Sequence, residues 1–148
     1  MKISAPPTSS LPLDKAFETA LETRIPQFVP TTQFTDDRGW SVMNQMQGVL
    51  NAQGQINFSM QYPGVVKAWH RHTLQTDFWM CLVGHLKVGV YDQEKDQAWS
   101  IVIGEKRPGT VIIPPPLWHG AATVGPTPAG LLYFVTHQYN PAKPDEER

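Results

Sequence analysis

The chain has 148 residues, the length of one domain, and it can bury a core without stabilising cross-links. Its 12 basic and 13 acidic residues give a net charge of −1. A protein that binds nucleic acids or membrane surfaces needs an excess of basic residues, and this chain has none. The single cysteine cannot form an internal disulfide, and no apolar run resembles a leader or a membrane span, so we expect a cytoplasmic protein.

The beginning of the chain predicts an extension with one short helix. Residues 1–11 are rich in Ser, Pro and Thr and are expected to be extended or mobile. Pro12 suits a first helical position, and Phe17 and Leu21 lie four residues apart on one face of the helix that would follow. We therefore predict an N-terminal extension with a short helix over residues 1–33.

From Phe34 onward the pattern changes to short strands. Apolar residues alternate in Gln55–Tyr62, which is the period of a half-buried strand. Further segments rich in Val, Ile, Tyr and Phe are separated by Gly and Pro, and these are Val65–His72, Asp77–Asp92, Ala98–Gly104, Thr110–Pro114 and Leu131–Tyr139. Many short strands at even spacing predict an all-β sandwich or barrel. We place the barrel in residues 34–140 and expect a disordered tail over 141–148.

Three histidines and one carboxylate have a spacing that indicates a metal site. His70 and His72 are two residues apart, so on a strand both rings project to the same face. Asp77 follows after a short turn and can face them from the next strand, while His119 comes from a distant part of the chain. Such ligands suit Fe(II), Mn(II), Ni(II), Co(II) or Zn(II) and leave one or two positions open. We predict one divalent metal ion here, with a three-histidine site as the alternative if Asp77 binds only through water.

This spacing resembles the two sequence motifs of the cupin superfamily. The first motif is matched in order by Gly64, His70, His72, Asp77 and Gly84, with Asp in place of the usual Glu. The second motif is matched by Gly109, Pro114 and His119, with Pro116 in place of its glycine. The resemblance implies an all-β cupin fold, which is a double-stranded β-helix or jelly-roll barrel.

A longer stretch, from about Phe34 to Pro141, resembles the dTDP-4-dehydrorhamnose 3,5-epimerase family, which is itself a cupin family. The matching segments are Phe34-Thr-Asp-Asp-Arg38-Gly39-Trp40, Gln55-Ile-Asn57-Phe-Ser59, Gly64-Val-Val-Lys67-Ala-Trp-His70, Ile113-Pro114 to His119-Gly120, Leu132-Tyr133 and Tyr139-Asn-Pro141. That family moves protons on the carbons beside the C4 ketone of a 4-keto-6-deoxy sugar. The resemblance implies a small-molecule substrate of the sugar-nucleotide class. It also implies a homodimer.

The resemblance also implies roles for individual residues. His70 would be the general base and Tyr133 the proton donor on the opposite face of the sugar. Cations at Arg38 and Lys67 would pair with the diphosphate. The remaining positions would bind the sugar, the phosphate or the nucleotide base, and these are Gln55, Asn57 and Trp40. The simpler alternatives are core packing for Trp40 and Tyr133 and a structural ion pair for Arg38.

Two departures from the epimerase pattern coincide with the predicted metal ligands. The family's catalytic lysine falls at Asp77, and the residue two after the base falls at His72. If His70 binds a metal ion, its lone pair is occupied and it cannot also act as the free base. A metal ion could then replace the lysine in stabilising an enolate.

Three functions from different classes are compatible with these residues. We favour a metal-dependent epimerase or isomerase that acts next to the ketone of a keto sugar or sugar nucleotide. The alternatives are a non-haem iron dioxygenase and a non-catalytic cupin that binds a small molecule. The fold alone does not decide among them. We favour the first because the resemblance extends beyond the cupin motifs to Arg38, Gln55, Asn57 and Tyr133.

Overall fold

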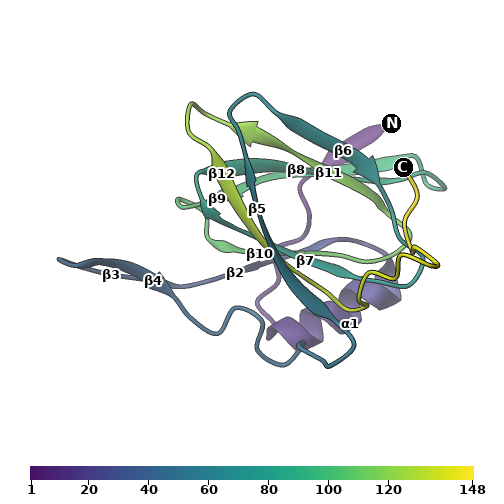
Figure 1. Ribbon diagram of the computed structural model, residues 1–148, viewed down its shortest axis with the longest axis horizontal. Helices are drawn as coiled ribbons and strands as arrows, with labels where there is room; N and C mark the ends of the chain where they lie inside the picture. Colours follow the sequence, from purple (N-terminus) through teal and green to yellow (C-terminus); the bar gives the residue numbers. More distant parts are fainter.

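Two five-stranded β-sheets form a barrel in the computed structural model, which describes all 148 residues (Figure 1). The strand order is β1-β9-β8-β11-β6 in the first sheet and β2-β10-β7-β12-β5 in the second. The elements in chain order are β1 Lys2–Ser4, α1 Leu13–Thr23, β2 Gln27–Pro30, β3 Gln33–Asp36, β4 Gly39–Val42, β5 Gln55–Gln61, β6 Val66–His70, β7 Asp77–Val83, β8 His85–Asp92, β9 Gln97–Gly104, β10 Gly109–Ile113, β11 Trp118–Val124 and β12 Ala129–Val135. The predicted all-β barrel with one short helix is confirmed.

The first 33 residues contribute more to the barrel than the sequence predicted. Strand β1 pairs in parallel with β9, and β2 pairs with β10 in antiparallel register. Both sheets therefore include a strand from before the predicted boundary at residue 34. Strands of three and four residues are too short to show a clear alternation, and their partners are distant in sequence, which explains why the pattern did not reveal them.

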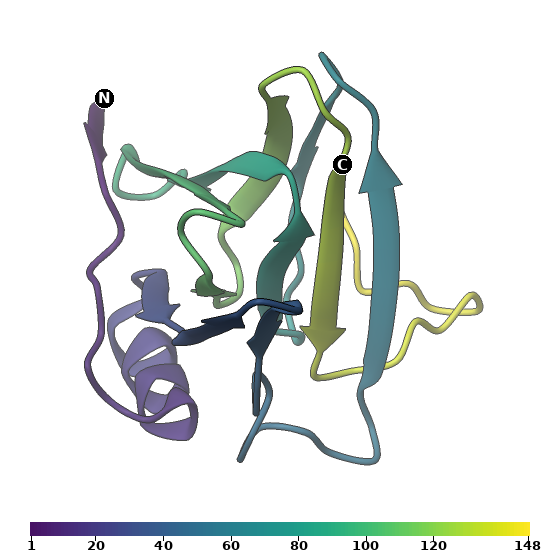
Figure 2. The same ribbon diagram turned by 90° about the vertical axis from the view of Figure 1, so that its left-hand side faces the viewer.

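Strand β7 is buried on both of its faces, which accounts for its nearly continuous apolar sequence. Phe78 and Met80 point outward into a cluster that includes Ala16 and Ala20 of α1. Trp79 and Cys81 point into the barrel core between the two sheets. Figure 2 shows α1 beside the second sheet, as this packing requires. The same alternation turns Asp77 toward the barrel interior, because residues two apart in a strand share a face.

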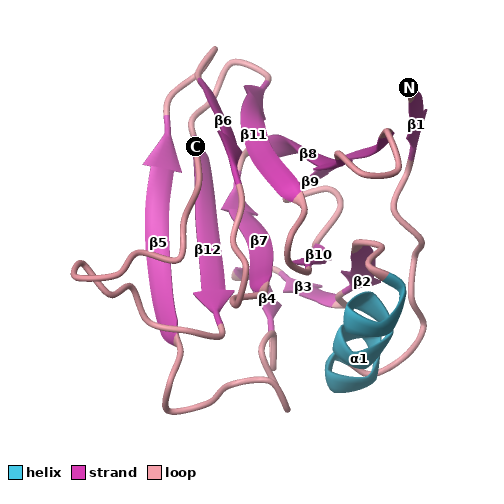
Figure 3. Ribbon diagram, turned by 90° about the vertical axis from the view of Figure 1, so that its right-hand side faces the viewer, coloured by secondary structure: helices cyan, strands magenta, loops and turns pink.

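The hairpin of β3 and β4 lies away from the barrel (Figure 1). Its two strands pair only with each other. Phe34 and Trp40 on this hairpin are largely exposed. In the second sheet, β7, β12 and β5 lie side by side, and β5 forms one edge (Figure 3). No helix of the protein has the length and apolar character needed to cross a membrane.

Candidate metal centre

The four predicted metal ligands meet at one end of the barrel, where β6 ends and β7 and β11 begin. His70 and His119 are direct cross-strand partners on β6 and β11, and their ring centroids are 4.2 Å apart. One potential ligand atom from each of the residues His70, His72, Asp77 and His119 lies within 4.8 Å of the others. The structure thus brings together all four side chains that the sequence selected.

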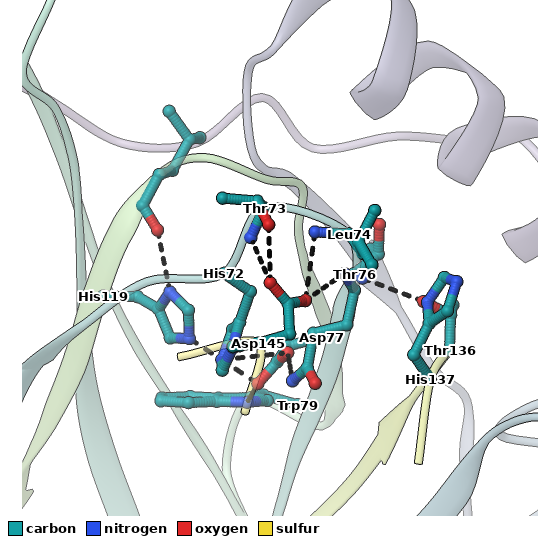
Figure 4. A network of polar contacts seen from close by, with 12 residues as sticks. His72, Thr73, Leu74, Thr76, Asp77, Trp79, His119, Thr136, His137 and Asp145 are labelled. Atoms are coloured by element: carbon teal, nitrogen blue, oxygen red, sulfur yellow. Dashed lines mark hydrogen bonds and ion pairs between the residues drawn. The ribbon is translucent and has the colours of Figure 1, made fainter. Parts of the chain in front are cut away.

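Backbone carbonyls fix the orientation of two of the histidine rings. Nδ1 of His119 donates to the carbonyl oxygen of Leu117 at 2.9 Å, and Nδ1 of His72 donates to the carbonyl oxygen of Asp145 (Figure 4). A carbonyl oxygen can only accept, so Nδ1 carries a proton, and in the neutral ring the lone pair lies on Nε2. Metal-binding histidines use this same arrangement, in which one ring nitrogen donates outward and the other faces the metal.

Both Nε2 atoms are buried and have no hydrogen-bond partner in the protein. His72 and His119 are 7% and 1% exposed, so water does not compensate these lone pairs from outside. A buried polar atom without a partner costs free energy, and native proteins therefore rarely leave one without a reason. Two buried, uncompensated nitrogen lone pairs that face one carboxylate are a donor set that fits a divalent cation.

Asp77 is the anionic member of the cluster. Gln75 Nε2 donates to its Oδ1 at 2.7 Å, and Trp79 Nε1 donates to its Oδ2 at 3.0 Å. The carboxylate oxygens lie 3.8 Å from Nε2 of His72 and 3.6 Å from Nε2 of His119. Burial by itself would raise the pKa of Asp77, but the neighbouring His119 and His72 lower it below its usual value. The carboxylate is therefore ionised at neutral pH, as a metal ligand must be.

The Trp79→Phe variant is expected to weaken this cluster. It removes the indole N–H that donates to the buried carboxylate of Asp77, and losing a hydrogen bond to a buried charged group costs about 1–3 kcal/mol. The free energy of unfolding, measured with urea, should fall by that amount beyond the effect of lost volume. Trp99→Phe is the matched control, because Trp99 is also buried but its indole donates to no protein group. Equal losses in the two variants would contradict the proposed contribution of the hydrogen bond.

A cavity of about 820 Å³ opens onto the cluster. His70 and Asp77 line it together with Tyr133, Lys67 and Glu146. Burial, and then the neighbouring His119 and His72 rings, lower the pKa of His70 to about 4, so its ring is neutral at neutral pH. Burial, and then the charge of Asp77, raise the pKa of Tyr133, so its hydroxyl remains protonated. The cavity therefore combines a neutral imidazole, a phenol that can donate a proton, and a cation.

Four of the predicted substrate-binding residues lie outside the lining of this cavity, namely Gln55, Asn57, Arg38 and Trp40. Asn57 is the cross-strand partner of Tyr133, and Gln55 Nε2 donates to Asn57 Oδ1 at 3.2 Å. Neither Gln55 nor Asn57 lines the cavity itself. Arg38 and Trp40 lie on the β3–β4 hairpin and do not line it either. The side chain of Arg38 is 86% exposed and forms an ion pair with Asp36, which matches the structural alternative for this residue.

Sequence reasoning missed the residues that complete the cavity from the far end of the chain. The tail expected to be disordered instead places Asp145 against His72 and Glu146 in the cavity wall. The contacts explain this correction, because the Asp145 carboxylate and two backbone hydrogen bonds between Glu147 and Arg71 fasten the segment to the barrel. A short charged stretch containing proline has no periodicity that could indicate such contacts.

Comparison with known proteins places the chain among proteins of polysaccharide biosynthesis. Residues 34–147 match the family described as "Polysaccharide biosynthesis C-terminal domain". The chain is 37% identical over 121 residues to the spore coat polysaccharide biosynthesis protein SpsL of Bacillus subtilis (strain 168), covering 77% of this chain and 80% of that protein.

Two further proteins connect this similarity to sugar enzymes. The chain is 41% identical over 97 residues to a probable low-salt glycan biosynthesis epimerase of Haloferax volcanii, and the match covers 62% of each chain. The crystal structure of a dTDP sugar isomerase from Desulfovibrio desulfuricans G20 superposes with a TM-score of 0.73 at 27% identity, covering 83% of this chain and 82% of that one. The predicted resemblance to cupin-type dTDP-sugar epimerases is confirmed.

Proposed function

Because the chain belongs to the polysaccharide biosynthesis C-terminal domain family, we propose that it is a sugar epimerase or isomerase whose site binds a divalent metal ion. The similarity to a glycan biosynthesis epimerase and to a dTDP sugar isomerase supports the class of reaction. The substrate we propose is a keto sugar linked to a nucleotide. The observation that supports the metal is the pair of buried Nε2 lone pairs on His72 and His119, which face Asp77 beside a substrate-sized cavity.

The metal ligands in this proposal are His70, His72, Asp77 and His119. The ligand atoms of the four lie within 4.8 Å of one another, and the neutral imidazole is the form that binds metal. When bound, a divalent ion supplies Lewis acidity toward a carbonyl oxygen. Because His70 belongs to this cluster and is the cross-strand partner of His119, we assign it to metal binding rather than to the role of free base.

Tyr133 is the residue that we propose to move a proton. It lies in the cavity wall, and burial keeps its hydroxyl protonated. After the C–H proton beside the ketone has passed to water, a phenol in this place can donate its proton to the carbon of the enolate, and the phenolate then regains a proton from solvent. Lys67 lines the same cavity and supplies a positive charge suited to a phosphate of the substrate.

A homodimer stays a prediction of the sequence. Arg38 and Trp40 lie on a projecting hairpin away from the metal cluster of their own chain. If these two residues bind substrate, as the family resemblance implies, they would do so in the cavity of a second copy.

Hydrogen exchange in D₂O tests the proposed reaction directly. The enzyme is incubated with a dTDP-linked 4-keto-6-deoxy hexose, and the sugar is followed by mass spectrometry and proton NMR. We expect deuterium at a carbon next to the ketone and loss of this exchange after treatment with a chelator. Addition of Mn(II) or Zn(II) should restore it.

The alternatives give different results in the same experiment. Full exchange by the metal-free protein would retain the epimerase and reject the role of the metal. Absence of exchange together with oxygen consumption by the Fe(II)-loaded protein would favour the dioxygenase. Binding of the sugar nucleotide without any exchange or oxygen uptake would favour a non-catalytic binding protein.

A further inference from the structure

The last four residues, Asp145–Arg148, form a strap that lies across the barrel end beside the metal cluster. Arg71 lies between His70 and His72 in the sequence. It exchanges two backbone hydrogen bonds of 3.0 Å with Glu147. Their side chains also form an ion pair at 2.8 Å. Glu146, the next residue along the strap, lines the cavity. The strap is thus held directly at the segment that supplies His70 and His72.

The carboxylate of Asp145 binds the turn between two of the ligands (Figure 4). Its Oδ1 accepts from the backbone N–H and the hydroxyl of Thr73 at 2.8 and 2.7 Å. Its Oδ2 accepts from the backbone N–H groups of Leu74 and Gln75, each at 3.0 Å. These three residues belong to the four-residue connection between His72 and the strand that begins at Asp77. One side chain therefore sets the conformation of the connection between two ligands.

The backbone of the same residue orients the ring of His72. Its carbonyl oxygen accepts from Nδ1 of His72, so the proton is held on Nδ1 and the Nε2 lone pair faces Asp77. We propose that Asp145 is a positioning residue of the metal centre, which fixes both the tautomer of His72 and the turn that leads to Asp77. This inference rests on the proposed metal site and adds to it a residue from outside the cupin motifs.

The experiment uses three graded changes in the full protein. Asp145→Asn keeps Oδ1 as an acceptor but replaces one carboxylate oxygen with a donor, Asp145→Ala removes all four hydrogen bonds, and deletion of Asp145–Arg148 also removes the carbonyl. Lys143→Ala is the matched control, because Lys143 lies on the same segment and its side chain makes no hydrogen bond or ion pair. Circular dichroism and thermal unfolding verify that each variant is folded.

The first readout is the protonation pattern of the His72 ring without metal, from two-bond nitrogen–proton NMR spectra of protein with ¹⁵N-labelled histidine. We expect the Nδ1–H form in the wild type, in Lys143→Ala and in the two substitutions that keep the carbonyl, and a shift toward the Nε2–H form in the deletion, which removes it. The second readout is the affinity for Co(II) by calorimetry, which should fall about 10- to 100-fold in Asp145→Ala.

The two readouts separate this inference from the proposed function. A wild-type protein that binds no Co(II) would refute the metal site, while the ring spectra would still decide whether Asp145 orients His72. If the folded deletion variant keeps His72 in the Nδ1–H form, or if folded Asp145→Ala binds Co(II) as tightly as a metal-binding wild type, the positioning role is overturned. If the larger changes prevent folding, Asp145→Asn applies the Co(II) criterion, because it alters the carboxylate that binds the turn.

Discussion

The His119→Ala variant is expected to lose the metal ion that we propose for the wild-type protein. His119 is 1% exposed, its Nδ1 is held by the Leu117 carbonyl, and its Nε2 has no other partner. Removing the ring takes away one of the nitrogen donors and leaves the Asp77 carboxylate facing an empty space. Elemental analysis of untagged protein should give about one Fe, Mn, Ni, Co or Zn per chain for the wild type and almost none for the variant.

Thermal unfolding gives an independent measure of the same loss. A metal ion at 100 times its dissociation constant stabilises a folded protein that binds it by about 2.7 kcal/mol. Added metal should therefore raise the unfolding temperature of the wild type but not of His119→Ala. His85→Ala is the matched control, since His85 lies outside the cluster and its Nε2 accepts from the backbone of Lys106. A wild type without metal, or a His119→Ala variant with a full complement, would refute the site.

The Tyr133→Phe variant is expected to lose about 100- to 10,000-fold in kcat, which is the usual contribution of general acid–base catalysis. The change removes one hydroxyl from the cavity wall and keeps the ring that packs against the barrel core. Because we propose that the lost hydroxyl acts on the reacting carbon, we expect KM to change little. Deuterium exchange at the sugar under saturating substrate measures this effect.

A second tyrosine provides the control for Tyr133. Tyr91 lies on β8, and its hydroxyl donates to Asp96 at 3.0 Å on the protein surface. Tyr91→Phe removes the same atom outside the catalytic cavity and should retain the wild-type rate. If Tyr133→Phe also retains it, another group moves the proton, and Tyr133 has only the packing role that the sequence left open.

Three members of the candidate metal cluster were predictable because they follow local rules. His70 and His72 share a face through the period of a strand, and Asp77 begins the next apolar strand after a short turn. His119 was placed only through the resemblance to the second cupin motif. Its pairing with His70 joins residues that are distant in sequence, and no local pattern reveals such a partner.

The rest of the site depends on contacts that leave no local signal. Asp145 acts through a carboxylate and a carbonyl on an irregular segment, which composition alone would assign to a disordered tail. The position of Arg38 also could not be deduced, because nothing in its sequence neighbourhood shows that the β3–β4 hairpin lies away from the barrel. Short strands such as β1 and β2 were missed because their pairing is set by distant partners.

The double burial of β7 determines where the chain can tolerate insertions. Successive residues of this strand serve two compartments in turn, with Asp77 and Trp79 in the barrel and Phe78 against α1. One inserted residue would exchange the two faces, so that an aromatic ring would enter the metal cluster and a carboxylate would lie under the helix. The β3–β4 hairpin has no second sheet neighbour, so added residues at its tip would disturb only its own pairing. Homologous chains should therefore keep the length of β7 constant while that of the hairpin varies.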